Sequence, residues 1–452
     1  MRIFFLFLIT LILLVSIGQV VATAKPQLIL VVIFGLVLSV LTVMNLEWGL
    51  YILIFVLPFT VQYQLGKTVQ MGTDDLLLLF LIFSWLANRA RTKESTFVAT
   101  PLNWPFILFF VIGTISLIQL TSRFSQDWVL LGVLHLLRFF EYVFIYFIVV
   151  SCIKELPQVR KFTIAFFINV GVVAMIQIVQ NLIGGKLTPG IFYADNTVVR
   201  YAVSTFHSNA ILGAFYCFAL SIVIGLIVTI RSAGTKTVLT IFGVAISFAL
   251  FNTFSRSAYV GIIVGIFVIA ILKERRLFIL FLALLIISPI LMQPAVSERI
   301  TMTFQQVNPT IQLDPSAQVR LTLWGQTFKI FMENPIFGVG WWGIRSILKT
   351  EAHSQYWAYL TEIGIVGFSI FLWLMARIFK ISLWVKNNAP DNFMEGLGLG
   401  YAAGLAGILA TCLFSETLEA FRMLGPLWFM TGLIVSVRSI LLSQKIPSQD
   451  LR

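Results

Sequence analysis

The sequence predicts an all-α membrane protein, a polytopic transmembrane helical bundle of about 12–14 helices with one long extracytoplasmic loop that contains an interfacial helix. Three observations predict this class. Of the 452 residues, 59% are hydrophobic and only 11% are charged, and the mean hydropathy is +0.96, which excludes an ordinary soluble protein. Apolar runs long enough to cross a bilayer as helices recur from Phe4 to Leu442. These runs lack the polar–apolar alternation of membrane β-strands.

The individual helices are predicted from the apolar runs in chain order. The first run follows Arg2 and ends before Ala22-Thr23-Ala24, which resembles a signal-peptide cleavage site, but the run is long for a signal peptide and we expect a retained helix. The region 27–64 allows either two crossings or one helix plus a re-entrant piece. The expected helices span residues 3–22, 27–44, 48–64, 74–88, 103–121, 129–152, 162–184, 208–230, 237–252, 257–272, 277–292, 355–376, 396–414 and 424–442.

The basic residues predict the orientation of these helices. If the N-terminus is cytoplasmic, every sizeable cluster of Lys and Arg falls on the cytoplasmic side, as the positive-inside rule requires. Both termini are then cytoplasmic. Membrane orientation also accounts for most of the formal charge of +12, so no nucleic-acid partner is expected. The clusters lie at residues 89–93, 154–161, 231–236, 273–276, 377–386 and 438–452.

One extracytoplasmic loop, residues 293–354, is much longer than the others, and long loops of this kind often carry function. Apolar residues recur at helical spacing from Ser316 to Glu333, which predicts a helix lying in the membrane interface. Asn334-Pro335 ends this helix, and the glycine- and tryptophan-rich stretch Gly338 to Gly343 predicts a tight aromatic turn.

Four residues on the predicted extracytoplasmic side are candidates for chemistry. His353 lies where the long loop re-enters the membrane, and a histidine with a pKa of about 6.5 can act as a general base. Arg256 lies at the mouth of a helix, where an arginine needs a partner or a ligand. Its forked donors suit phosphate, and Arg320 and Arg200 lie on the same side. For each arginine alone, a side chain that reaches lipid headgroups is the alternative.

Other polar residues have simpler interpretations. Arg138 and Glu141 lie at i and i+3 within an apolar helix, one turn after His135, so mutual neutralisation is favoured over a polar pathway through the membrane. Asp74 and Asp75 open a helix and are expected to be caps. The repeated glycines Gly396, Gly400 and Gly404 predict close helix packing.

Several classes of chemistry are disfavoured. The chain has no Asp-x-Asp sequence, and its linear order suggests no dense carboxylate cluster on the extracytoplasmic face, so a metal-dependent sugar transferase is not expected. No Walker or Rossmann glycine sequence is present, so neither ATP hydrolysis nor a nucleotide cofactor is expected. The three cysteines, which lie in or beside apolar runs, indicate neither disulfides nor a zinc site.

Several stretches of the long loop and two earlier stretches form a recognisable set of motifs: Arg200 with Phe206-His207-Ser208-Asn209, Phe254-Ser255-Arg256-Ser257, Arg320 with Trp324, Asn334 to Gly340, Ala352 to Gln355 and Glu362 to Gly367. Together they resemble the O-antigen ligase and O-antigen polymerase superfamily. At Ser354 the sequence departs from the family, which usually has asparagine after the histidine. The clear motifs begin near Arg200, so we divide the chain into N-terminal transmembrane helices at 1–195 and an O-antigen ligase-like domain at 196–452.

The resemblance implies a bacterial inner (plasma) membrane enzyme without metal or cofactor. It would transfer a glycan from a polyprenyl (undecaprenyl) diphosphate-linked donor to an acceptor hydroxyl on the periplasmic face, in lipopolysaccharide or surface polysaccharide biosynthesis. The implied partners are this donor, a glycan or lipid A core acceptor, and the bilayer. By motif, His353 would be the catalytic base. Arg256, Arg320 and, less strongly, Arg200 would bind the donor diphosphate.

Three alternatives remain open at the level of sequence. A polymerase that joins lipid-linked repeat units, or a transferase that attaches the glycan to protein, would share this mechanism and differ in its acceptor. A membrane transporter of an anion or a lipid-linked glycan would instead use the polar groups at His135, Arg138 and Glu141. No duplicated halves are evident in the chain, which favours the enzyme.

Overall fold

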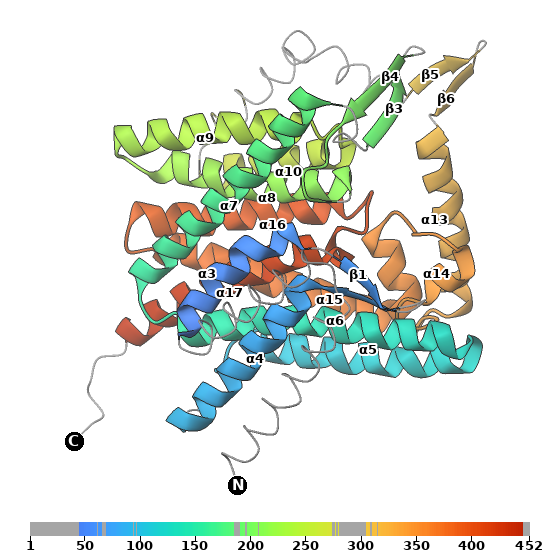
Figure 1. Ribbon diagram of the computed structural model, residues 1–452, viewed down its shortest axis with the longest axis horizontal. Helices are drawn as coiled ribbons and strands as arrows, with labels where there is room; N and C mark the ends of the chain where they lie inside the picture. The colour runs from blue at the N-terminus through green and yellow to red at the C-terminus, as the bar shows by residue number, and fades with distance from the viewer. Residues whose placement is uncertain are drawn as a thin grey trace, which may run out of the picture.

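The computed structural model confirms the predicted fold class, because the described part of the chain is nearly all helical and forms a polytopic bundle (Figure 1). Thirteen α-helices form within the described part of the chain. Eight of these are long and apolar enough to cross a membrane, namely α5, α6, α7, α8, α9, α15, α16 and α17. The structure describes residues 45–60, 62–65, 69–93, 95, 97–184, 190–194, 197–206, 208–273, 276, 279, 304–307, 310–313 and 315–445.

The helices follow the predicted apolar runs, except that α15 continues to Asn388, beyond its predicted end at residue 376, and the helix predicted within the long loop is α13. The expected helices at 3–22 and 27–44 lie outside the described residues, as does 277–292 apart from residue 279. The described helices are α3 (Leu46–Val56), α4 (Thr73–Thr92), α5 (Asn103–Arg123), α6 (Gln126–Cys152), α7 (Leu156–Ile183), α8 (Asn209–Thr229), α9 (Ala233–Phe251), α10 (Arg256–Leu272), α13 (Pro315–Glu333), α14 (Gly343–Leu348), α15 (Gln355–Asn388), α16 (Asn392–Thr411) and α17 (Phe421–Lys445).

One helix prediction was wrong in its second half. The helix expected at 48–64 ends at Val56, continues as a 3₁₀ turn over Leu57–Phe59, and gives way to strand β1. Pro58 explains the early end, because proline has no backbone N–H for the next helical hydrogen bond.

Three short antiparallel hairpins interrupt the helical pattern, and the sequence did not predict them. Each is an isolated two-stranded pair. In Figure 1, β1 and the strands of the other two hairpins lie toward the same end of the bundle as α13 and α14. We call this end, which carries α13, α14 and the α9–α10 and α16–α17 connections, the loop end. The strands are β1 (Gln62–Leu65), β2 (Val69–Gly72), β3 (Gly190–Ala194), β4 (Thr197–Tyr201), β5 (Phe304–Val307) and β6 (Thr310–Leu313).

The centre of the bundle depends on close contact between α8 and α16, and the predicted role of the glycine repeat is confirmed. A Cβ atom added at Gly400 would lie 2.5 Å from Ile222 Cα, and one added at Gly396 would lie 2.8 Å from Leu226 Cα. At Gly404 the nearest neighbour is the Phe218 side chain, at 2.7 Å. The helices therefore approach at a distance that only glycine allows, as in other membrane helix pairs.

Helices from both parts of the chain pack together. Helix α17 packs along α6, α15 packs along α5, and α10 packs against α8 and α16. The most buried of the long helices are α8, α16 and α17. This packing fixes the helix ends from which the site at the loop end is built.

Candidate functional site

A cavity of about 370 Å³ at the loop end brings two of the predicted arginines together. Arg256 lines it from the start of α10, and Arg320 lines it from α13. These residues are 64 positions apart in the sequence, and the sequence placed them only on the same side of the membrane. The remaining walls are formed by Tyr201, Asn209, Ala210, Phe254, Ser255, Ser257, Val260, Ala317, Leu321, Trp324 and Phe414.

The Arg256 side of the cavity is shaped by a tight connection between α9 and α10. Phe254 has a φ of +52°, in the left-handed region, which turns the chain sharply. The Ser255 hydroxyl then caps α10 by accepting a hydrogen bond from the Ala258 N–H at 3.4 Å. Arg256 is therefore the first residue of α10. A helix N-terminus carries partial positive charge, so an anion bound in the cavity would be attracted by this helix end as well as by the guanidinium.

The Arg320 side is held by contacts between α13 and the rest of the loop end. Leu323 and Thr327 are buried, and the Thr361 hydroxyl of α15 donates to the Thr327 carbonyl at 3.4 Å. Trp324 packs near Phe414, with ring centroids 6.3 Å apart. Anchored in this way, α13 presents Arg320 to the cavity and forms one of its walls.

The third arginine, Arg200, is placed by its backbone next to a residue that lines the cavity. Arg200 is on β4, where its backbone pairs with Ile191, and the next residue, Tyr201, lines the cavity. Asn209, from the same predicted motif, donates its side-chain amide to the Thr253 carbonyl at 3.3 Å and so ties the start of α8 to the α9–α10 connection. His207 lies outside the described residues.

His353 lies in the short segment between α14 and α15, as the sequence predicted, and its backbone is in the left-handed region with a φ of +53°. It is partly buried and is not among the residues that line the cavity. Burial lowers the pKa of its imidazole below the usual 6.5, and the positive charges of Arg320 and Arg345 lower it further, against the opposing effect of Glu351. The imidazole is therefore neutral at pH 7 and able to accept a proton.

Two of the stretches that carry the resemblance turn out to bind each other. Helix α15 is broken at Gly364, where φ is +67° and ψ is −174°. The backbone of residues 335–340 fills the break: Val339 N donates to the Thr361 carbonyl at 2.8 Å, Gly340 N donates to the Glu362 carbonyl at 3.0 Å, and Ile365 N donates to the Pro335 carbonyl at 2.8 Å. A broken helix inside a bundle needs such replacement partners for its freed backbone groups. The sequence predicted an uninterrupted helix here.

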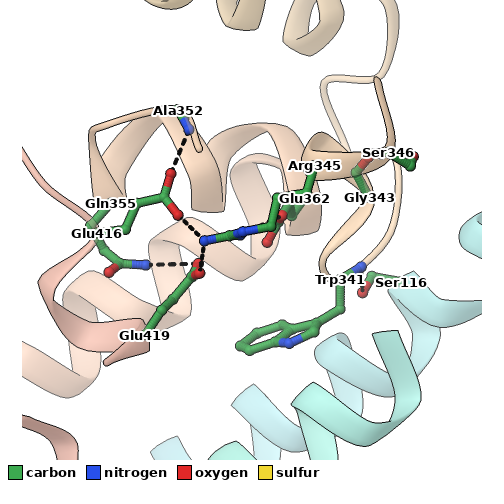
Figure 2. A network of polar contacts seen from close by, with 10 residues as sticks. All are labelled: Ser116, Trp341, Gly343, Arg345, Ser346, Ala352, Gln355, Glu362, Glu416 and Glu419. Atoms are coloured by element: carbon green, nitrogen blue, oxygen red, sulfur yellow. Dashed lines mark hydrogen bonds and ion pairs between the residues drawn. The ribbon is translucent and has the colours of Figure 1, made fainter. Parts of the chain in front are cut away.

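A buried ionic cluster that the sequence did not suggest lies beside this break (Figure 2). Arg345 of α14 forms ion pairs with Glu416, with Glu419 at 2.6 Å and, at 3.8 Å, with Glu362 of α15. Glu419 also accepts a hydrogen bond from the Gln355 side chain at 3.3 Å. The three glutamates come from two separate segments of the chain and surround a guanidinium, so this cluster is not of the kind that the sequence was expected to lack, a carboxylate site for magnesium or manganese.

Arg345 occupies the centre of this cluster. Burial alone would lower the pKa of its guanidinium, but Glu419, Glu416 and Glu362 outweigh this effect and raise the pKa above its usual value, so Arg345 stays charged. Burial raises the pKa of Glu416, as does the nearby Glu419, while Arg345 opposes both. Within the described residues, no group of three or more His, Cys, Asp or Glu side chains is arranged to hold a metal ion.

A column of stacked side chains connects this cluster to the polar residues of α6. The Arg345 guanidinium lies 3.6 Å from the centroid of Trp342, and the His135 ring is stacked 3.5 Å from the same centroid. The stack continues from His135 to Phe421, whose ring centroid is 6.2 Å from that of His135. The same Phe421 centroid lies 3.9 Å from the guanidinium carbon of Arg138. His135 thus contributes to packing through its ring contacts with Trp342 and Phe421.

The polar residues of α6 are partly neutralised, but by a different partner from the one predicted. Arg138 forms an ion pair with Asp75 of α4 at 3.0 Å rather than with Glu141. Asp75 also accepts a hydrogen bond from Gly72 N at 2.7 Å, so the predicted cap is confirmed. Asp74, which was also expected to be a cap, instead accepts a hydrogen bond from the Tyr142 hydroxyl. These contacts join α4 to α6 in the interior.

The fold and the site define a multi-pass membrane protein with a cationic cavity and a nearby neutral histidine at one end. Residues 240–372 match the family model described as O-antigen ligase, in agreement with the resemblance seen in the sequence. The matched region contains Arg256, Arg320, His353 and both halves of the helix break, whereas Arg200 lies outside it. The family match supports a role in polymerising or ligating glycans at a membrane.

A comparison with curated proteins found no match. Among solved structures, the chain is similar to one from a study described as "Structural coordination of polymerization and crosslinking by a peptidoglycan synthase complex". The sequence identity is 15% and the TM-score is 0.43, and the alignment covers 76% of this chain and 99% of that chain.

Proposed function

We propose that this chain is a glycosyltransferase of the O-antigen ligase type, which transfers a glycan from a polyprenyl diphosphate-linked donor to an acceptor hydroxyl without a metal ion. The observation that carries the proposal is the cavity at the loop end, which places Arg256 and Arg320 on facing elements of the O-antigen ligase domain. The forked N–H donors of a guanidinium match the geometry of phosphate oxygens, so two arginines suit a diphosphate.

In the proposed reaction, Arg256 and Arg320 hold the donor diphosphate and stabilise the negative charge that it gains as the sugar–phosphate bond breaks. Arg200 is proposed as a further contact on the hairpin beside the cavity. His353 accepts the proton of the acceptor hydroxyl as that oxygen attacks the anomeric carbon. The lowered pKa of His353 supports this role, because the base must be unprotonated before it acts. The leaving group is the polyprenyl diphosphate.

We propose the ligase as the activity of this chain and the polymerase as its alternative, since the two differ only in the acceptor. Lipid A core, another glycan or a lipid-linked repeat unit would each present a hydroxyl to His353. We place the site on the periplasmic face of the inner membrane, with both termini cytoplasmic, since the loop end is the end opposite the predicted cytoplasmic clusters of basic residues.

The test is reconstitution of the purified protein in liposomes with a labelled polyprenyl diphosphate-linked glycan and candidate acceptors. We expect transfer that is insensitive to EDTA, and we expect His353→Ala to abolish it while the protein remains folded. Full transfer by His353→Ala would contradict the proposed role of His353 as the catalytic base. A need for added divalent metal would contradict the metal-free reaction, and movement of the donor across the bilayer without transfer would favour a transporter.

A further inference from the structure

The backbone around His353 needs external support. The residue lies in a short irregular segment with a φ of +53°, a conformation that costs free energy for any residue other than glycine and persists only where the surroundings hold it. No turn of helix fixes this segment until α15 begins at Gln355. The position of the imidazole is therefore set by what binds residues 352–355.

That support comes from the α16–α17 connection. The Ala352 N–H donates to Oε1 of Glu416 at 2.5 Å, on the N-terminal side of His353. On the C-terminal side, the Gln355 N–H donates to the Cys412 carbonyl at 2.9 Å. The Leu418 N–H also donates to the side-chain oxygen of Gln355 at 3.0 Å. His353 is thus held from both sides by a connection more than fifty residues away in the sequence.

Glu416 is itself fixed by a second contact. Its Oε2 atom forms an ion pair with Arg345, so the carboxylate bridges the guanidinium and the Ala352 N–H (Figure 2). Both side chains are largely buried, with 2% of Glu416 and 12% of Arg345 exposed. A buried carboxylate that lost this partner would be strongly disfavoured. Arg345 is held in turn by Glu419 and by the face of Trp342.

We infer that Glu416, fixed by Arg345, is a positioning residue that sets the place of His353 relative to the cationic cavity. The inference rests on the proposed function for its catalytic consequence, whereas its structural consequence can be measured separately. The Glu416 carboxylate has no contact with the arginines of the cavity among its described hydrogen bonds and ion pairs. Removal of the Glu416 carboxylate should therefore displace His353, the proposed base, and leave donor binding nearly intact.

The kinetic test compares Glu416→Ala and Glu416→Gln with wild type in liposomes supplied with a labelled polyprenyl diphosphate-linked glycan. We expect Glu416→Ala to lower kcat by about 10- to 100-fold, since a small displacement of a reacting group has effects of this size, with donor KM within about twofold. Glu416→Gln keeps an oxygen that can accept from Ala352 N–H, so it should retain more activity than Glu416→Ala. Equal kcat for the two variants would overturn the inference, as would wild-type kcat for both.

The matched control is Glu395, whose carboxylate pairs with Lys273 at 2.5 Å at the opposite end of the bundle. Glu395→Ala and Glu395→Gln make the same chemical changes without touching the loop end, and we expect both to keep wild-type kcat. An equal loss in the Glu395 variants would mean that any broken ion pair lowers activity, which would also overturn the inference.

The spectroscopic test does not depend on catalysis. The chain has three histidines, so ¹³Cε1-labelled histidine gives a simple spectrum in which His353→Ala identifies the His353 signal. We expect that signal to shift or broaden in Glu416→Ala and to stay unchanged in the Glu395 variants. An unchanged His353 signal in folded Glu416→Ala would refute the positioning role. If Glu416→Ala does not fold, Glu416→Asp decides by the same signal, because its shorter side chain keeps the charge but cannot reach both Arg345 and the Ala352 N–H.

These readouts separate the two proposals. If His353→Ala keeps full activity, the proposed base is wrong, and the histidine signal still tests the positioning contact. If His353→Ala is inactive while Glu416→Ala has wild-type kcat and an unchanged signal, the positioning role alone is wrong.

Discussion

Substitution of Gly364 by alanine tests whether the break in α15 is an essential part of the fold. At this residue φ is +67° and ψ is −174°, a region that is essentially limited to glycine and costs about 1–3 kcal/mol for other residues. An added Cβ would lie 2.1 Å from the Ile336 carbonyl oxygen and 2.6 Å from Phe337 N. Because both neighbours are backbone atoms, the paired segment has to move.

That movement would disrupt the hydrogen bonds from Ile365 N to the Pro335 carbonyl and from Val366 N to the Ile336 carbonyl, at 2.8 and 3.4 Å. Each hydrogen bond contributes about 0.5–1.5 kcal/mol. Together with the backbone strain, Gly364→Ala should lower the free energy of unfolding by about 2–6 kcal/mol. Activity should fall as well, because residues 335–343 lead directly into α14 and Arg345.

The assay is unfolding in detergent by titration with SDS, followed by the fluorescence of the 11 tryptophans. Gly325→Ala is the matched control, because Gly325 lies within α13 and an added Cβ would meet nothing within 4 Å. At an open helical position, alanine should stabilise by about 0.5–1 kcal/mol. A loss below about 1 kcal/mol in Gly364→Ala, the lower end of the cost of the strained backbone alone, would refute the reasoning.

Three further predictions concern the cavity, the histidine and the bundle centre. Arg256→Lys should weaken donor binding by about 10- to 100-fold, the value of one lost charged hydrogen bond, and unchanged binding of the labelled donor would contradict the phosphate role. Since burial and neighbouring arginines lower the pKa of His353, kcat/KM should fall only as the pH drops through a midpoint below 6.5, and a pH–rate profile with a midpoint above 6.5 would contradict this. Gly400→Ala should destabilise the protein by about 1–3 kcal/mol, because the added Cβ would lie 2.5 Å from Ile222 Cα. Titration with SDS measures this loss of stability. An unchanged unfolding curve would show that α8 and α16 can move apart without cost, which would contradict the prediction.

Much of the fold depends on residues that are close together in the sequence, and it could be predicted for that reason. Apolar runs of membrane-spanning length define helices by themselves, because a helix satisfies its own backbone within the bilayer. The helix α13 and the glycine repeat of α16 also follow from spacing along one helix. The break at Gly364 escaped prediction because Gly364 lies in a continuous apolar stretch, Ile363 to Val366, that is equally compatible with an unbroken helix.

The ionic contacts show the opposite case. Arg138 was expected to pair with Glu141 three residues away, yet its partner Asp75 is 63 residues distant. The Arg345 cluster joins Glu362 with residues of the α16–α17 connection, and no spacing rule relates them. Pairing of this kind depends on which helices pack side by side, and the sequence pattern of one helix does not show which other helices it contacts.

The sequence by itself determined the class of protein, the positions of most helices and the identities of Arg256, Arg320 and His353 as candidates. Those features depend on hydrophobicity, helical spacing and motif, which are properties of contiguous residues. Only the tertiary structure decided that the two arginines share one cavity, that two motifs pair across a broken helix, and that Glu416 holds the segment of His353. These arrangements join residues far apart in the chain, and the packing of helices against one another is what brings such residues within reach.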